Sequence, residues 1–203
     1  MELLTLLLRK AVGFGERAGA VFRYLAGVAV LCVPPALGLV HAAEKESLEN
    51  AVKAAYLSKF GLYVEWPDTA FSSPSSALTL CVVGEDPFGA ALDKTAADQR
   101  VDGRPIVVRR LKTVGRDSGC HILYIGGSDA PHTRQTIDTV RGSSVLTVSD
   151  ARGTQVGAII NFVVKDNRVR FDIDDEAAAQ NRLTISSKLL SLALNVKRRQ
   201  EAR

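Results

Sequence analysis

The sequence is poor in the residues from which catalytic and metal centres are usually built. Its 203 residues include three cysteines, three histidines and one tryptophan. Neither His121 nor His132 has a second ligand at the spacing of a zinc site. There is no phosphate-binding loop with a Lys-Ser or Lys-Thr end, no nucleophile elbow and no Ser-x-x-Lys site. These absences favour a binding protein over an enzyme, and we expect neither a metal nor a cofactor.

One arrangement could still carry nucleophilic chemistry, because His121 directly follows Cys120 in an apolar segment. A catalytic Cys-His pair is one interpretation, and it requires a free thiolate. The other interpretation is a buried histidine held by hydrogen bonds, and we prefer it. The state of Cys120 decides between them.

The first 42 residues have the order of a secretory signal. An apolar run over residues 24–40 leads to a segment with small residues at the two positions that a signal peptidase reads, ending at Ala42. We therefore expect cleavage after Ala42, and residues 43–203 as one periplasmic domain. A retained membrane anchor is the alternative, but Pro34-Pro35 interrupts a run that barely reaches bilayer length. The run is preceded by four basic residues: Arg9, Lys10, Arg17 and Arg23.

The basic character of the chain belongs partly to this leader. The leader carries four basic and two acidic residues, so its removal lowers the net charge from +4 to +2. A charge of this size gives no reason to expect nucleic-acid binding.

The cysteine count predicts one disulfide. Cys32 lies in the leader, and Cys81 and Cys120 remain. Two cysteines in an oxidising compartment favour a bridge, and two separate buried thiols are the alternative. A bridge of this loop length stabilises the fold by roughly 4 kcal/mol in the chain-entropy model.

The hydrophobic pattern predicts a single α/β domain. Strands alternate with helices or long loops, which favours a mainly parallel sheet of about six strands flanked by about five helices. The last two strands meet at Asp166-Asn167, a pair suited to a tight antiparallel hairpin. The predicted strands are residues 78–83, 106–111, 120–125, 145–148, 158–164 and 168–173, and the predicted helices are 47–63, a short one near 88–92, 131–141, one from 174, and 186–196.

Several local features of these helices are also predicted. Asp86 is expected to cap the short second helix, with Pro87 as its first residue. The last helix is expected to end in a frayed basic tail, residues 197–199. The buried face of the first helix is expected to carry Val52, Tyr56, Phe60 and Tyr63.

Two glycine-containing turns follow predicted strands, over residues 84–87 and 126–129. Because ligands of open α/β sheets bind beyond the carboxyl ends of the strands, these turns could border a small-molecule crevice. Ordinary strand-to-helix turns are the alternative.

Seven sequence blocks, in one order, resemble those of the YfiR-like periplasmic domains. Each block is weak alone, and together they span about Asn50 to Val196. The blocks are VKAAYL with YVEWP (residues 52–57 and 63–67), LCVVG with DPF (80–84 and 86–88), GRP (103–105), CHILYI (120–125), VLTVSD (145–150), VRFDI (169–173) and LTISSKLL (183–190).

The resemblance implies a periplasmic repressor. It would bind the periplasmic sensory domain of a membrane-bound diguanylate cyclase and lower cyclic di-GMP output. It also implies an outer-membrane lipoprotein that sequesters the repressor, a sheet flanked by helices, and a homodimer. The paired cysteines of the family fall on Cys81 and Cys120, whereas a second pair that some members carry is absent here.

Two other functions stay open beside this one: a periplasmic small-molecule sensor that uses the crevice, and an enzyme, for which no catalytic set assembles. For the aromatic members of the candidate contact set, plain core packing is the alternative. The candidate partner- or ligand-binding residues are Tyr56, Tyr63, Trp66, Arg182 and Lys188.

Overall fold

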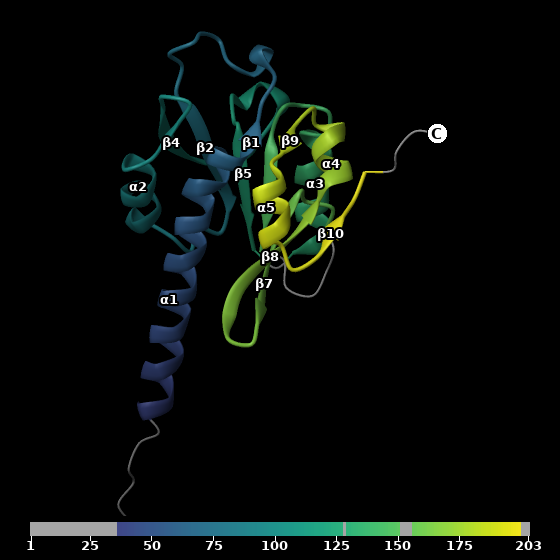
Figure 1. Ribbon diagram of the computed structural model, residues 1–203. Helices are drawn as coiled ribbons and strands as arrows, with labels where there is room; N and C mark the ends of the chain where they lie inside the picture. The colour runs from purple at the N-terminus through teal and green to yellow at the C-terminus, as the bar shows by residue number, and fades with distance from the viewer. Residues whose placement is uncertain (1–35, 128, 151–155, 200–203) are drawn as a thin grey trace, which may run out of the picture. The chain divides into compact units, whose positions relative to one another are not determined.

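The computed structural model describes residues 36–127, 129–150 and 156–199 (Figure 1). Residues 1–35, the larger part of the predicted signal peptide, lie outside these ranges, so cleavage after Ala42 stays a prediction. Helix α1 (Ala36–Phe60) starts earlier than expected and passes through that position. Within the described ranges, no helix combines the length and the apolar character needed to cross a bilayer.

The centre of the fold is an eight-stranded sheet with the order β10-β8-β7-β6-β5-β2-β4-β3. Neighbouring strands from β4 to β7 run parallel, and β7 and β8 form an antiparallel hairpin. This confirms the predicted mainly parallel sheet. Six strands match the predicted ones, and two-residue strands extend both edges: β2 (Leu78–Gly84), β3 (Arg100–Val101), β4 (Arg104–Leu111), β5 (Ile122–Gly126), β6 (Leu146–Ser149), β7 (Ile160–Lys165), β8 (Arg168–Asp174) and β10 (Val196–Lys197).

The β7–β8 hairpin turns where the sequence predicts. Asp166 and Asn167 have positive φ values of 49° and 61°. Side chains of this kind tolerate the left-handed conformation that a two-residue hairpin turn needs. The turn sets the register, so Phe162 pairs with Phe171 and both point into the core.

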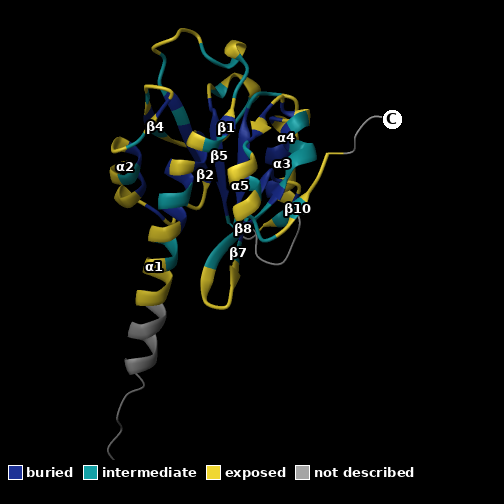
Figure 2. Cartoon of the chain, viewed as in Figure 1, coloured by how far each residue is buried: buried dark blue, intermediate teal, exposed yellow. Residues whose placement is uncertain are grey.

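The sheet is covered on both faces. Side chains alternate along each strand, so Leu80 and Val82 of β2 enter one core, and Cys81 and Val83 enter the other. The larger core is closed by α1, α2 (Ala90–Ala97) and α5 (Ser187–Leu192), and the smaller one contains Ile137 of α3 (Ala130–Thr139). The central strands are accordingly buried almost throughout (Figure 2). Helix α4 (Asp175–Gln180) also contributes Ala178 to the larger core.

The buried face of α1 is rotated from the predicted one. Ala54 and Leu57 are fully buried with Phe60, whereas Val52 is 36% exposed and Tyr56 is only half-buried. The prediction for Val52 was therefore wrong. The helix turns Lys53 inward instead, and a hydrophobic pattern does not anticipate a charged residue on a buried face.

The second helix also differs from its prediction, because Asp86 does not cap it. The Asp86 carboxylate accepts hydrogen bonds from the backbone N–H groups of Phe88 and Gly89, which closes a local turn. Gly89, with φ at 49°, then occupies the N-cap position of α2. The helix consequently begins at Ala90, three residues later than the Pro87 start expected.

The C-terminal segment is ordered as a strand rather than a frayed helical tail. Helix α5 ends at Leu192, and β10 pairs in parallel with β8. Lys197 Nζ forms ion pairs with Asp174 and Glu176, at 3.2 and 2.8 Å. The prediction of a helix to residue 196 was therefore wrong, since pairing with β8 and these charges hold the segment extended. A separate two-stranded sheet joins β1 (Val64–Glu65) to β9 (Thr184–Ile185).

Candidate functional site at the carboxyl ends of the parallel strands

Lys53 is completely buried, which is rare for a lysine. It projects from α1 toward the end of β6, where Asp150 follows the last strand residue. Its Nζ lies 2.5 Å from Glu49 Oε1 on the same helix and 2.6 Å from Asp150 Oδ2. The ring of Phe162 lies beneath the ammonium group, 6.0 Å from Nζ to the ring centroid. We call Lys53, Glu49 and Asp150 the buried triad.

The triad fastens α1 to the sheet. Moving an isolated charge out of water costs several kcal/mol, and a partner of opposite charge at hydrogen-bond distance offsets that cost. Glu49 and Asp150 keep 13% and 18% of their side-chain surface exposed, so each carboxylate retains some contact with water. The ammonium of Lys53 can be satisfied in this way only when α1 sits at one position along the sheet.

Tyr124 of β5 borders the triad. Burial raises the pKa of the Tyr124 phenol, and neighbouring carboxylates, Asp150 first among them, raise it further. The phenol therefore stays protonated at every physiological pH. Its ring packs edge-on against Phe88, with centroids 4.7 Å apart.

Four of the seven sequence blocks meet here. Lys53 belongs to VKAAYL, Asp150 ends VLTVSD, Tyr124 belongs to CHILYI and Phe88 ends DPF. The sequence alone did not identify the triad. The available signal was a lysine three residues before the first aromatic residue of a predicted helix and an aspartate directly after a predicted strand, but neither indicates that the two residues pair.

The two glycine-containing turns, which could have bordered a crevice, are in direct contact where they meet. Gly84 of β2 pairs with Gly126 of β5, and a Cβ built on Gly126 would overlap the carbonyl oxygen of Glu85. The two turns therefore pack backbone against backbone. Ser128 lies outside the described residues. At the positions where the turns meet, the ordinary-turn interpretation is the correct one.

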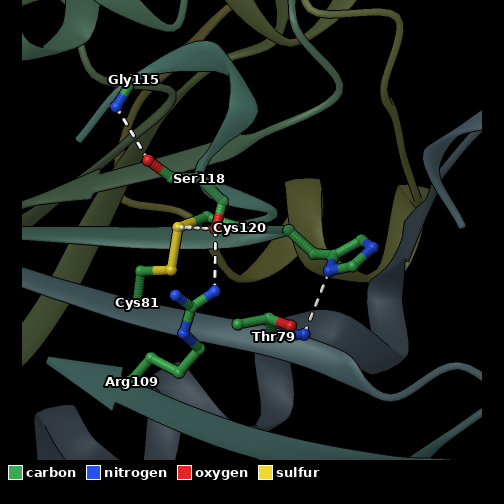
Figure 3. The surroundings of a disulfide bond; sticks show 7 residues. Thr79, Cys81, Arg109, Gly115, Ser118 and Cys120 are labelled. Carbon is green, nitrogen blue, oxygen red and sulfur yellow. Dashed lines mark hydrogen bonds between the residues drawn. A yellow bond between two sulfur atoms is a disulfide. The ribbon is translucent and has the colours of Figure 1, made fainter. Parts of the chain in front are cut away.

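The predicted disulfide joins Cys81 of β2 to Cys120, just before β5 (Figure 3). The two Cα atoms are 5.7 Å apart, and both side chains lie in the smaller core. Arg109 Nη1 donates a hydrogen bond to the carbonyl oxygen of Ser118 beside the bridge, at 2.9 Å. Because the sulfur of Cys120 is bonded, it offers no thiolate, and the catalytic Cys-His interpretation is wrong.

His121 is buried and hydrogen-bonded on both ring nitrogens, as we preferred. Nδ1 accepts from the backbone N–H of Thr79 at 3.0 Å, and Nε2 lies 3.0 Å from the carbonyl oxygen of Ala70. The ring therefore carries its proton on Nε2. It stacks on Phe71, and the guanidinium of Arg104 lies over the ring of Phe71, 3.9 Å from the ring centroid. Burial, and after it the charge of Arg104, lowers the pKa of His121.

The predicted contact residues come from several elements. Tyr56 packs between Phe60, Phe162 and Phe171 in the larger core, and Tyr63 and Trp66 lie half-buried against the same core. Core packing therefore accounts for much of the surface of the three aromatic side chains.

The two predicted basic contact residues are exposed. Arg182 donates a hydrogen bond to the carbonyl oxygen of Gly142 at 3.0 Å, and Lys188 lies in the first turn of α5. Their contact with a partner stays a prediction.

These features define a class: a mainly parallel α/β domain, fastened by one disulfide, whose most unusual charges are enclosed rather than displayed in an open pocket. Residues 50–194 match a family model described as YfiR/HmsC-like (DUF4154). The match covers well over half of the chain, which therefore belongs to the YfiR/HmsC-like family. A comparison with curated proteins finds no match. The family is periplasmic and regulatory rather than catalytic, and the disulfide fits an oxidising compartment.

Proposed function

We propose that this protein is a periplasmic negative regulator that binds the periplasmic sensory domain of a membrane-bound diguanylate cyclase and lowers cyclic di-GMP signalling. The observation that carries the proposal is the family match over residues 50–194. The architecture is consistent with a binding role, because four of the seven sequence blocks meet at a buried junction that fastens α1 to the sheet. An element that is already fixed in the free protein loses little conformational entropy when a partner binds.

Repression follows from preferential binding to the inactive state of the cyclase. A ligand shifts a two-state receptor only by its difference in affinity for the two states, and a strong shift needs several kcal/mol. A standard protein interface of about 800 Å² on each partner can supply this. We also propose, from family membership, a homodimer and an outer-membrane lipoprotein that sequesters the regulator.

The test is a measurement of cyclic di-GMP in cells that lack the gene but keep the candidate cyclase. We expect cyclic di-GMP to rise in the deletion strain and to return to its normal level when the full chain is supplied. A version without residues 2–42 should fail to restore it, because this version stays in the cytosol.

The matched control is a strain in which the cyclase is deleted as well. There the loss of the regulator should change nothing. An unchanged cyclic di-GMP level in the single deletion, with the cyclase expressed, would contradict the proposal.

A further inference from the structure

Strand β4 presents an open edge. On one side it pairs with β2, residue by residue from Ile106 to Leu111. On the other side β3 pairs only with Arg104 and Pro105. Over residues 36–127, 129–150 and 156–199, no strand, loop backbone or side chain forms a hydrogen bond with the main chain of residues 106–111 on that outer side. An unpaired edge of this length is a template for an added strand.

The open edge is flanked by uncompensated positive charge. Between Arg100 and Arg116 the chain has six basic residues and a single acidic one, Asp102. Arg109 and Lys112 are exposed, and neither has a carboxylate partner among the residues that the structure describes. Val107, on the same strand, is 45% exposed, so the edge also offers apolar surface.

Arg110 differs from its neighbours because it is already neutralised. It forms ion pairs with Asp86 at 2.7 Å and with Asp93 of α2 at 2.8 Å. Side chains alternate along a strand, so Arg110 and α2 lie on one face of β4, while Val107 and Arg109 lie on the other. The Arg109 charge is therefore on the face that α2 does not cover, and Lys112 directly follows the last residue of β4.

The positive charge beside β4 indicates what kind of strand could pair with its outer edge. A second copy joined antiparallel through the same edge would bring the arginines of two β4 strands together, and like charges on paired strands are destabilising. An acidic strand would instead neutralise Arg109 and Lys112. Charged side chains on an edge strand also protect a protein from pairing with copies of itself. The same positive charges do not oppose pairing with an acidic strand.

We propose that the outer edge of β4, residues 106–111, is a docking edge that receives an extended, acidic segment of a partner protein as an added strand. Main-chain hydrogen bonds supply affinity, and Arg109 and Lys112 supply the preference for acidic side chains. The inference concerns the chemistry of the bound segment and stands whether or not the partner is a cyclase.

The test uses the full exported protein and a fluorescein-labelled peptide in which glutamate and valine alternate. We expect the peptide to bind, as measured by fluorescence anisotropy, and to bind more weakly as salt is raised. It should also slow amide hydrogen exchange within residues 106–111. The same peptide with alternate backbone nitrogens methylated cannot complete the ladder and should not bind. A peptide that alternates lysine and valine should not bind either.

Variants separate this edge from general electrostatic attraction. The Arg109→Glu/Lys112→Glu protein should bind the acidic peptide about tenfold more weakly. The matched control, Lys165→Glu/Arg168→Glu at the β7–β8 hairpin, should bind like the wild type. Arg109 also donates a hydrogen bond to the carbonyl oxygen of Ser118, which the double variant removes. The single variant Lys112→Glu keeps this hydrogen bond and is therefore tested as well. Equal binding of the methylated peptide, equal effects of the two double variants, or no binding to the wild type would each overturn the proposal.

Discussion

Lys53 and Asp150 are 97 positions apart in the sequence, and Lys53 Nζ lies 2.6 Å from Asp150 Oδ2. The contact joins the first helix to the end of the fourth parallel strand of the sheet in chain order, β6. It also places the lysine ammonium where water cannot reach it, because Lys53 is completely buried. The position of α1 on the sheet therefore depends on this charge.

Removing the lysine should destabilise the domain strongly. Lys53→Met keeps the length of the side chain but leaves Glu49 and Asp150 partly buried without their cation. We expect the free energy of unfolding, measured by urea denaturation, to fall by about 3 kcal/mol. The exposed Lys59→Met on the same helix is the control and should change it by less than about 0.5 kcal/mol. Similar losses in the two variants would show that the triad does not hold the helix.

Loss of the disulfide should destabilise the protein without abolishing the sheet. Cys81→Ala/Cys120→Ala frees a long loop, and we expect the unfolding free energy to fall by roughly 2–5 kcal/mol. Chemical reduction of the wild type should shift its urea midpoint in the same direction and leave the double variant unaffected. Free thiols titrating in the untreated native protein would contradict the bridge between Cys81 and Cys120.

His121 should make stability depend on pH. Its pKa in the folded protein lies below the ordinary value of 6.5, so the unfolded chain takes up a proton more readily. The stabilisation is complete above pH 6.5 and is lost as the pH falls through the folded pKa. Protonation would place a hydrogen on Nδ1 against the N–H of Thr79. We therefore expect urea midpoints to drop below pH 6.5.

Two histidine variants and the fluorescence of Trp66 test whether His121 causes the loss of stability at low pH. His132→Gln, at an exposed position on α3, should keep the drop, whereas His121→Gln should flatten it within the same pH window. Trp66 is the single tryptophan and lies five residues before Phe71, which stacks on His121. Its fluorescence should change over this window in the wild type. A drop that persists unchanged in His121→Gln would assign it to other groups.

Gly126 should be intolerant of any side chain. A Cβ at this position would overlap the carbonyl oxygen of Glu85, and main-chain atoms cannot move aside cheaply. We expect Gly126→Ala to lower the unfolding free energy by several kcal/mol. Gly103→Ala is the control: it has open space and a φ of 79°, so it should cost only about 1–2 kcal/mol of backbone strain. Equal losses would indicate that the two turns separate readily.

The sequence predicted those parts of the fold that depend on local pattern. Runs such as residues 78–83 and 120–125 combine β-branched and apolar side chains at strand length, and the Asp166-Asn167 turn has one favoured geometry. The disulfide followed from counting cysteines, since only two lie outside the leader. These features need no knowledge of distant contacts.

The sequence did not predict features that depend on contacts between distant segments. Lys53 points inward because Asp150, at the end of β6, pairs with its ammonium group. A prediction from the helical hydrophobic pattern places every lysine on the exposed face. Strand β10 has two residues and exists because β8 lies beside it. The start of α2 depends on Asp86, whose carboxylate binds Arg110 as well as the local backbone. In each case the deciding partner is more than 20 residues away.

The placement of Lys53 also affects how a growing chain can assemble. The segment that forms α1 comes first, both in synthesis and in the expected export, and more than 90 residues follow before Asp150. Until then, Glu49 is the only member of the triad available to balance the ammonium, and settling α1 onto the early strands would cost hydration energy. We therefore expect α1 to dock on the sheet late in folding, after β6 has brought Asp150 to the lysine.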